Sequence, residues 1–134
     1  MLIIKAVQTK EQQAALCAVC GVKYRAESLC YQAYLGEGPD DETTFIGICQ
    51  FDMNGIGYLY DLVCAPNVDD EEALFIMGRQ TLNFMDLTGT HEAIFRPQSE
   101  TSEHLIKWLG FRQKDGEWYM DLHGMFDKHA KNRE

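Results

Sequence analysis

Residues 56–85 read IGYLYDLVCAPNVDDEEALFIMGRQTLNFM, and they contain the strand–helix unit on which the predicted fold depends. It begins with an apolar run rich in Val, Leu and Tyr, closed by Pro66, which is typical of a buried strand. A helical pattern of apolar residues follows over 70–86. The first amides of a helix are unpaired and its dipole is positive there, so this arrangement forms a cradle for an anion. We therefore expect a ligand at the carboxyl end of the 56–64 strand.

Four consecutive acids fill that cradle. Asp69, Asp70, Glu71 and Glu72 occupy the turn where a phosphate binder would place glycines and a cation. Two like charges about 6 Å apart repel by roughly 0.7 kcal/mol in water and about 3 kcal/mol at an effective dielectric constant of 20. The attraction between the positive end of the helix dipole and an anion contributes only about 0.3–1 kcal/mol per charge. The favoured interpretation is that these acids cap and stabilise the helix, and that an anionic ligand is disfavoured here.

Length and charge exclude several classes of protein. A chain of 134 residues fits one domain. The net charge of -9 argues against nucleic acid and against an anionic membrane surface, and it favours cationic or neutral ligands. The first ten residues contain only a three-residue apolar run, which predicts neither a signal peptide nor a membrane span. We expect a cytoplasmic protein.

Five cysteines are scattered through apolar segments, and their odd number favours buried thiols in a reducing compartment over a disulfide framework. Cys17 and Cys20 form a lone CxxC on one face of an expected helix. A zinc site would need two more ligands at matching spacing, so we interpret these thiols as structural and expect no metal.

The first half of the chain predicts one clear helix and several strands. We expect a strand over 2–7, a helix over 10–20, strands over 30–35 and 44–53, and an acidic turn over 36–42 between those strands. Thr9 can cap the helix and Gly21 can end it. Residues 22–29 are ambiguous and fit a second short helix with Tyr24 and Leu29 inward.

Beyond the long helix, Gly89 is the expected stop, and the remaining elements are short. We expect a strand over 91–95, a helix that Ser99 or Thr101 caps and Gly110 ends, and strands over 111–114 and 117–122. Asn54-Gly55 and Asp115-Gly116 each predict a type I′ hairpin turn.

This order of elements predicts an α/β (α+β) fold. We expect a central mixed, mostly antiparallel twisted sheet of about seven strands with helices on both faces. The strand–helix–strand unit over 56–95 implies one parallel, right-handed crossover. A single domain over 1–122 and a charged tail over 123–134 complete the expected organisation.

Two motifs carry a resemblance to a known family. DLVCAP ends the strand before the long helix, and EHLIKWLGF ends a short helix in Leu-Gly-Phe before the Asp-Gly hairpin. With this order of elements, residues 2–122 resemble the GCN5-related N-acetyltransferases (GNAT). The resemblance implies transfer of an acetyl group from acetyl-CoA to a primary amine, without a metal. It also implies that backbone amides near Leu62, Val63 and Cys64 bind the pantetheine and the thioester.

The sequence departs from the family pattern at two places. The segment over 68–73, aligned with the family's pyrophosphate loop, has neither its glycines nor its basic or amide residue. Ile106 stands where many members carry a thiol-protonating tyrosine, and the family's asparagine falls around Ser99. Arg96 and Lys107 are the remaining candidate phosphate partners.

The candidate catalytic residues are Asp61, Glu92 and Tyr119, and the candidate cofactor-binding residues are Leu62, Val63, Cys64, Asp69, Ala73 and Lys107. Asp61 is either a proton relay for the amine or a hydrogen-bonded strand carboxylate, with Tyr58 and Tyr60 expected on the opposite face. His104 is a second candidate acid, and Cys64 a candidate nucleophile without an obvious activating base.

Two functions remain open at this point. The first is an acetyl-CoA-dependent N-acetyltransferase acting on a small cationic amine or a peptide. The second is a non-catalytic binding or regulatory module that has lost the acetyl-CoA site. An open wedge between the 56–64 and 91–95 strands favours the enzyme, and a wedge plugged by large side chains favours the module. Pairing of the C-terminal hairpin with a second copy leaves a homodimer open as well.

Overall fold

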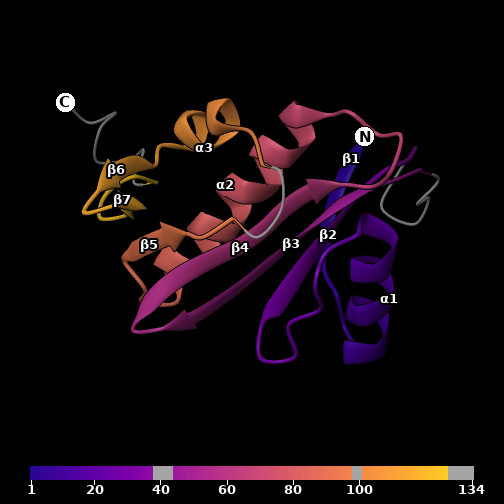
Figure 1. Cartoon of the computed structure of the whole chain (residues 1–134), viewed down its shortest axis with the longest axis horizontal. Helices are drawn as coiled ribbons and strands as arrows, with labels where there is room; N and C mark the ends of the chain where they lie inside the picture. Colours follow the sequence, from indigo (N-terminus) through magenta and orange to yellow (C-terminus); the bar gives the residue numbers. More distant parts are fainter. Residues whose placement is uncertain (38–43, 98–100, 127–134) are drawn as a thin grey trace.

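Two long neighbouring strands, β3 (Thr44–Asn54) and β4 (Ile56–Cys64), form the centre of the fold in a computed structural model that describes residues 1–37, 44–97 and 101–126 (Figure 1). The remaining strands are β1 (Leu2–Ala6), β2 (Leu29–Leu35), β5 (Glu92–Phe95), β6 (Arg112–Lys114) and β7 (Glu117–Asp121). The helices are α1 (Lys10–Cys20), α2 (Glu71–Leu87) and α3 (Glu103–Leu109). These bounds match the predicted elements within one or two residues.

The seven strands form one sheet in the order β1-β2-β3-β4-β5-β7-β6. Every neighbouring pair is antiparallel except β4 and β5, which the α2 crossover joins in parallel. Helix α1 lies on one side of the sheet, and α2 and α3 lie on the other (Figure 1). The predicted fold class, a mostly antiparallel seven-stranded sheet with helices on both faces, is confirmed.

The helix ends follow the capping residues. The Thr9 hydroxyl accepts a hydrogen bond from the Gln12 amide at 3.0 Å, and Gly21 ends α1 with a φ of 71°. Helix α2 starts after Asp70, whose carboxylate accepts from the Ala73 amide at 3.0 Å. The interpretation of the acidic turn as a helix cap is therefore confirmed for Asp70.

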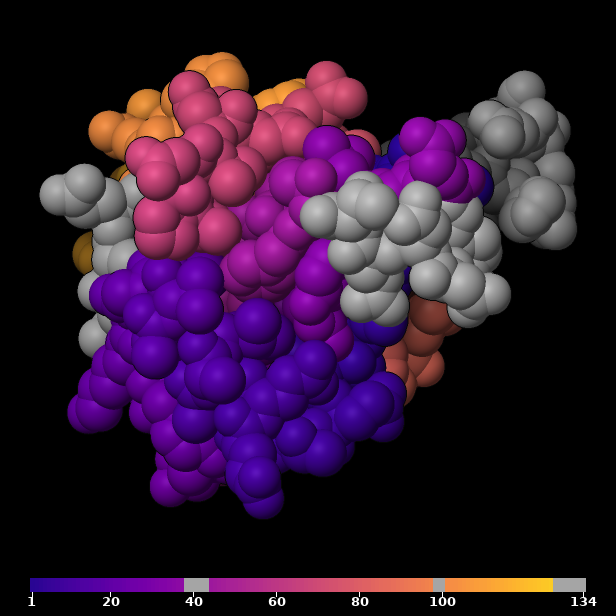
Figure 2. Space-filling model, turned by 90° about the vertical axis from the view of Figure 1, so that its right-hand side faces the viewer, coloured from indigo at the N-terminus to yellow at the C-terminus, as the bar shows by residue number. Residues whose placement is uncertain are grey.

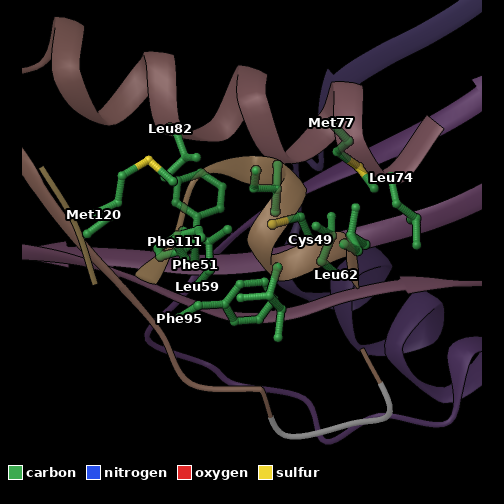
Figure 3. Packing of buried hydrophobic residues seen from close by; sticks show 14 of the residues in the cluster. Cys49, Phe51, Leu59, Leu62, Leu74, Met77, Leu82, Phe95, Phe111 and Met120 are labelled. Carbon is green, nitrogen blue, oxygen red and sulfur yellow. The ribbon is translucent and has the colours of Figure 1, made fainter. Parts of the chain in front are cut away.

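The main core lies between the sheet and α2 (Figure 3). Leu59 and Leu62 of β4 point toward α2, where Met77 and Leu82 meet them, and all four side chains are buried. Met85 of α2 is fully buried in the same core as Met77. This packing sets the distance between α2 and β4, and it therefore positions the first turn of α2 next to the end of β4.

Three local predictions are wrong. Residues 22–28 form no helix: they run as an irregular loop, because the Gln50 side chain holds the Lys23 carbonyl (2.9 Å) and the Arg25 amide (3.1 Å). Leu29 is 46% exposed and opens β2, while Tyr24 does pack inward. The cap of α3 is Ser102, whose hydroxyl accepts from the Leu105 amide at 3.1 Å.

The two Gly-containing turns differ. At Asp115-Gly116 both residues have positive φ, 54° and 82°, as a type I′ turn requires. At the other hairpin only Gly55 has a positive φ, 80°, and Asn54 already pairs with Ile56, so the predicted type I′ turn is wrong there. The acidic turn over 36–42 falls largely outside the described residues, and so do Ser99 and most of the tail over 123–134.

Candidate functional site

A β-bulge in β4 sets the geometry of the candidate site. Gln50 of β3 pairs with Asp61, but the next residue, Phe51, pairs with Leu59, so Tyr60 is the extra residue. The Arg25 guanidinium carbon lies 4.2 Å from the centre of the Tyr60 ring, and its Nε lies 4.0 Å from Asp61 Oδ2. The two side chains thus share one face. The predicted opposite placement of Tyr60 and Asp61 is wrong, because it assumed an unbroken strand alternation.

Beyond the bulge, β4 loses its partner on one side. The parallel ladder with β5 ends at Leu59–Phe95, followed by a hydrogen bond from the Arg96 amide to the Leu59 carbonyl at 2.8 Å. The Ala65 amide donates to β3, at Ile46. Since the backbone groups of a strand alternate in direction, those of Leu62 and Cys64 face the edge that β5 has left.

This divergence opens a cleft of about 590 Å³, which we call the β4 cleft. Its lining comes from β4, the end of α1, the start of α2 and the segment before α3: Cys20, Gly21, Val22, Leu62, Val63, Cys64, Val68, Asp69, Glu71, Leu74, Thr101 and Ser102. Figure 2 faces the side of the molecule where α1 and the start of α2 come together. The wall is apolar and the mouth is acidic.

Four predicted cofactor-binding residues line this cleft: Leu62, Val63, Cys64 and Asp69. Ala73 and Lys107 do not. The Ala73 side chain is buried and its amide is bound to Asp70, while Lys107 pairs with Glu103 at 3.2 Å along α3.

Glu71 lies at the mouth of the cleft, where two side chains hold its carboxylate in place. Its carboxylate accepts hydrogen bonds from the Ser102 hydroxyl at 3.0 Å and from His104, whose Nδ1 lies 2.5 Å away. These two contacts lower the pKa of Glu71, with the His104 bond the larger cause. Glu71 is therefore ionised at neutral pH and places a negative charge beside the first turn of α2.

Asp61 lies on the other side of the cleft wall, in a buried polar network that we call the Gln50 network: Gln13, Arg25, Ser28, Gln50 and Asp61. Gln50 Nε2 donates to Asp61 Oδ2 at 2.7 Å, and Gln50 Oε1 accepts from Gln13 Nε2 at 2.9 Å. The Asp61 side chain is fully buried. Its neighbour in sequence, Leu62, lines the cleft. The Asp61 carboxylate is thus buried and hydrogen-bonded directly behind the wall of the candidate site.

Glu92 and Tyr119 are brought together, but away from the cleft. The Tyr119 hydroxyl donates to Glu92 Oε1 at 2.7 Å, and this bond raises the pKa of Tyr119 to about 12. Glu92 precedes Ala93, which pairs with Gly57, so Glu92 is level with Ile56 and lies roughly 20 Å along β4 from Leu62 at about 3.3 Å per residue.

Arg96 also points elsewhere. Its guanidinium donates to both carboxylate oxygens of Glu117, at 3.0 and 3.3 Å, and lies over the Tyr58 ring at 4.7 Å.

The two cysteines on the cleft wall are poor nucleophiles. Burial raises the pKa of the Cys20 thiol to about 12, and burial likewise raises the pKa of Cys64. Both therefore remain thiols at neutral pH, which argues against a covalent role. Over the ranges that the structure describes, no three His, Cys, Asp or Glu side chains are arranged to hold a metal. None of the described helices is long and apolar enough to cross a membrane.

Sequence reasoning missed two groups that shape the site. Thr101, whose hydroxyl donates to the Leu62 carbonyl at 3.4 Å, closes part of the open edge of β4. Gln50 organises the polar network behind it. A glutamine inside the apolar run Ile48-Cys49-Gln50-Phe51 was the available signal, since a buried polar residue needs partners.

Solved structures with the same arrangement are acetyltransferases. An acetyltransferase from Bacillus subtilis, in complex with CoA, superposes with a TM-score of 0.63 at 14% identity, over 91% of this chain and 99% of the other. An N-acetyltransferase from Staphylococcus aureus superposes with a TM-score of 0.64 at 10% identity, over 92% of this chain and 99% of the other. An IAA acetyltransferase from Bacillus cereus superposes with a TM-score of 0.64 at 16% identity, over 86% of this chain and 79% of the other.

Comparison of the sequence with protein-family models and with curated proteins finds no match. The likeness therefore lies in the three-dimensional arrangement, which extends over nearly the whole chain. The chain has the fold of the GCN5-related N-acetyltransferases.

Proposed function

We propose that this protein is an acetyl-CoA-dependent N-acetyltransferase whose subsite for the pyrophosphate is weakened. The observation that carries the proposal is the β4 cleft, which opens where β4 and β5 diverge. Over the described residues, the edge of β4 beyond Leu59 borders this cleft, which supports the open wedge expected of the enzyme. On the edge of β4 that β5 has left, the Leu62 amide and the Cys64 backbone can pair with the amides of an extended pantetheine chain, as a strand would, while Thr101 contacts the Leu62 carbonyl. The Bacillus subtilis structure of the same fold holds CoA.

The acceptor that fits best is a cationic amine, either a small molecule or a peptide. The cleft mouth carries Asp69 and Glu71, and the chain as a whole has a net charge of -9. A field of this sign raises the local concentration of a cation and speeds its association.

Asp61 is the carboxylate in the best position to take up the amine proton. It follows the bulge and adjoins Leu62 of the cleft wall, whereas Glu92 lies at the far end of β5. Because the Asp61 side chain is fully buried, the proton would reach it through a water molecule rather than directly.

A specific observation favours the second candidate, a non-catalytic module. Glu71, held by Ser102 and His104, occupies the helix start that would otherwise accept a phosphate, and the Ala73 amide is already bound to Asp70. A module of this kind would keep the scaffold and bind no CoA.

Thermal unfolding with and without about 1 mM acetyl-CoA separates the two functions, with free CoA and pantetheine as controls. A ligand with a dissociation constant near 10 μM adds about 2.7 kcal/mol to the free energy of unfolding and raises the midpoint by several degrees. A shift with acetyl-CoA, followed by release of free CoA in the presence of an amine panel, would support the transferase. If the protein is well folded and none of these ligands raises its unfolding midpoint, the second function, the non-catalytic module, is supported instead.

A further inference from the structure

A second pocket lies at the opposite end of α1, at the turn from β1 into that helix. This β1–α1 pocket has a volume of about 300 Å³ and is lined in part by Lys10 and Gln13 of the first turns of α1. The β4 cleft is lined by Cys20 and Gly21 at the other end of the same helix. Ten residues of helix separate the two pockets by roughly 15 Å. A ligand in one pocket therefore leaves the other accessible.

Three aromatic rings from three elements form one wall of the β1–α1 pocket. Tyr31 of β2 stacks on Phe51 of β3 with ring centres 5.3 Å apart and planes 21° apart. Phe84 of α2 meets both rings edge-on, at 6.2 Å from Tyr31 and 6.1 Å from Phe51. This geometry leaves apolar and aromatic surface facing the pocket, which suits a small ring.

A cation without a carboxylate partner lies at the rim. Lys10 Nζ donates to Gln13 Oε1 at 3.1 Å and to the Ser28 carbonyl. Both acceptors are neutral, and Lys10 makes no salt bridge with any acid in the described part of the chain. Two neutral contacts hold the ammonium group in place without cancelling its charge, and its third hydrogen remains for an anionic partner.

The size of the pocket limits the ligand. At about 300 Å³ it is at the lower end of the range for small-molecule sites, enough for one ring and a short chain. We propose that the β1–α1 pocket binds a small aromatic carboxylate, with its ring against Tyr31, Phe51 and Phe84 and its carboxylate on Lys10. This site is independent of the proposed acetyl transfer, because it uses none of the residues of the β4 cleft.

The test uses 3-phenylpropionate as the probe and its neutral amide, 3-phenylpropanamide, as the matched ligand. Calorimetric titration of the full chain should show saturable binding of the carboxylate, at least tenfold tighter than that of the amide. Lys10→Gln should weaken carboxylate binding about tenfold, since it removes the charge but keeps a donor for the Ser28 carbonyl. Lys23→Gln removes an exposed lysine elsewhere and should leave the affinity unchanged.

Nuclear magnetic resonance locates the site on the same samples. Amide shifts on titration should centre on Lys10, Gln13 and Cys30. Shifts centred on Leu62–Cys64 would place the probe in the β4 cleft and overturn the proposal. The proposal also fails if the folded wild-type protein shows no saturable binding up to about 10 mM probe, if carboxylate and amide bind equally, or if Lys10→Gln binds as wild type. Phe84→Leu, which removes one ring of the wall, tests the aromatic contribution separately.

Discussion

Glu71 is the side chain that most changes what the β4 cleft can bind. Its carboxylate lies at the cleft mouth, ionised and held by Ser102 and His104. Glu71→Gln should tighten CoA binding at least threefold, because it removes a negative charge from the cleft mouth that repels a phosphate. Pantetheine, which carries no phosphate, should bind the variant and the wild type equally.

Glu72→Gln is the matched control for this substitution. It removes the same charge one residue further along α2, from an exposed side chain outside the cleft lining. Equal gains in CoA affinity from both variants, measured by isothermal titration, would show that overall charge rather than the position of Glu71 limits binding.

Asp61 is tested by its effect on turnover. Asp61→Asn keeps the shape of the side chain but removes its capacity to hold the proton, so acetyl transfer should fall about 10²-fold or more. The KM for acetyl-CoA should change little. Glu92→Gln, at the far end of β5, should retain activity. A steady-state assay of CoA release measures all three proteins, and full activity of Asp61→Asn would remove Asp61 from the mechanism.

At this scale, the sequence predicted the backbone of the site better than its side chains. The local pattern placed Leu62, Val63 and Cys64 at the end of a strand, and the family resemblance implied their role in binding. The placement of Tyr60 was missed because the bulge depends on how β4 registers against β3, and a single strand does not contain that information. The Gln50 network was missed for the same reason, since it joins four separate segments of the chain.

At the scale of elements, β3 and β4 approach closely at Gly47, beside the cleft. Gly47 pairs with Cys64, and a Cβ at Gly47 would lie 2.1 Å from the Val63 carbonyl oxygen. Backbone cannot move aside as a side chain can. Gly47→Ala should therefore destabilise the protein by about 3 kcal/mol or more, measured by urea unfolding.

Gly78→Ala gives the comparison within the same core. A Cβ there would meet only the ends of the Leu109 and Leu62 side chains, at 2.8 and 3.0 Å. Alanine also gains about 1 kcal/mol over glycine inside a helix, so the net loss should be clearly smaller than for Gly47→Ala. Equal losses of stability from the two substitutions would mean that β3 and β4 can move apart at Gly47 without cost.

Elements as such were largely predictable. The strand positions, the Asp115-Gly116 turn and the helix caps Thr9 and Asp70 depend on local features, and each appears in the structure. The conformation of residues 22–28 was not predictable in this way. Their backbone is held by Gln50, from a strand more than twenty residues away, rather than by helical hydrogen bonds of their own.

For the whole molecule, the thiols predict how stability depends on pH. Burial raises the pKa of Cys17 from 9.0 to about 11, and those of Cys20 and Cys49 to about 12. Above about pH 9 the unfolded chain loses these protons while the folded chain keeps them. The free energy of unfolding should therefore be level below about pH 8 and fall as pH rises from about 9 toward 12, by up to about 1.4 kcal/mol per pH unit for each thiol.

Urea unfolding at about pH 8, 9.5 and 10.5 measures this profile. Cys20→Ala removes one of the thiols and should flatten the decline. A profile that stays level to about pH 11 would contradict the assignment of these thiols as protonated in the folded state.

The junction between β4 and β5 has a consequence for how the molecule assembles. Strands β1 to β4 with α1 form a continuous stretch of sequence whose pairings are all between chain neighbours, whereas β5 reaches the sheet only after the chain has passed through α2. Three residue pairs make that parallel junction. Contacts between distant segments carry the larger entropic cost of closing a loop, so the N-terminal four strands should become protected against hydrogen exchange during refolding before β5 and β7 do. The segment after β5, which supplies Thr101 and Ser102 to the β4 cleft, would then complete the cleft late in folding.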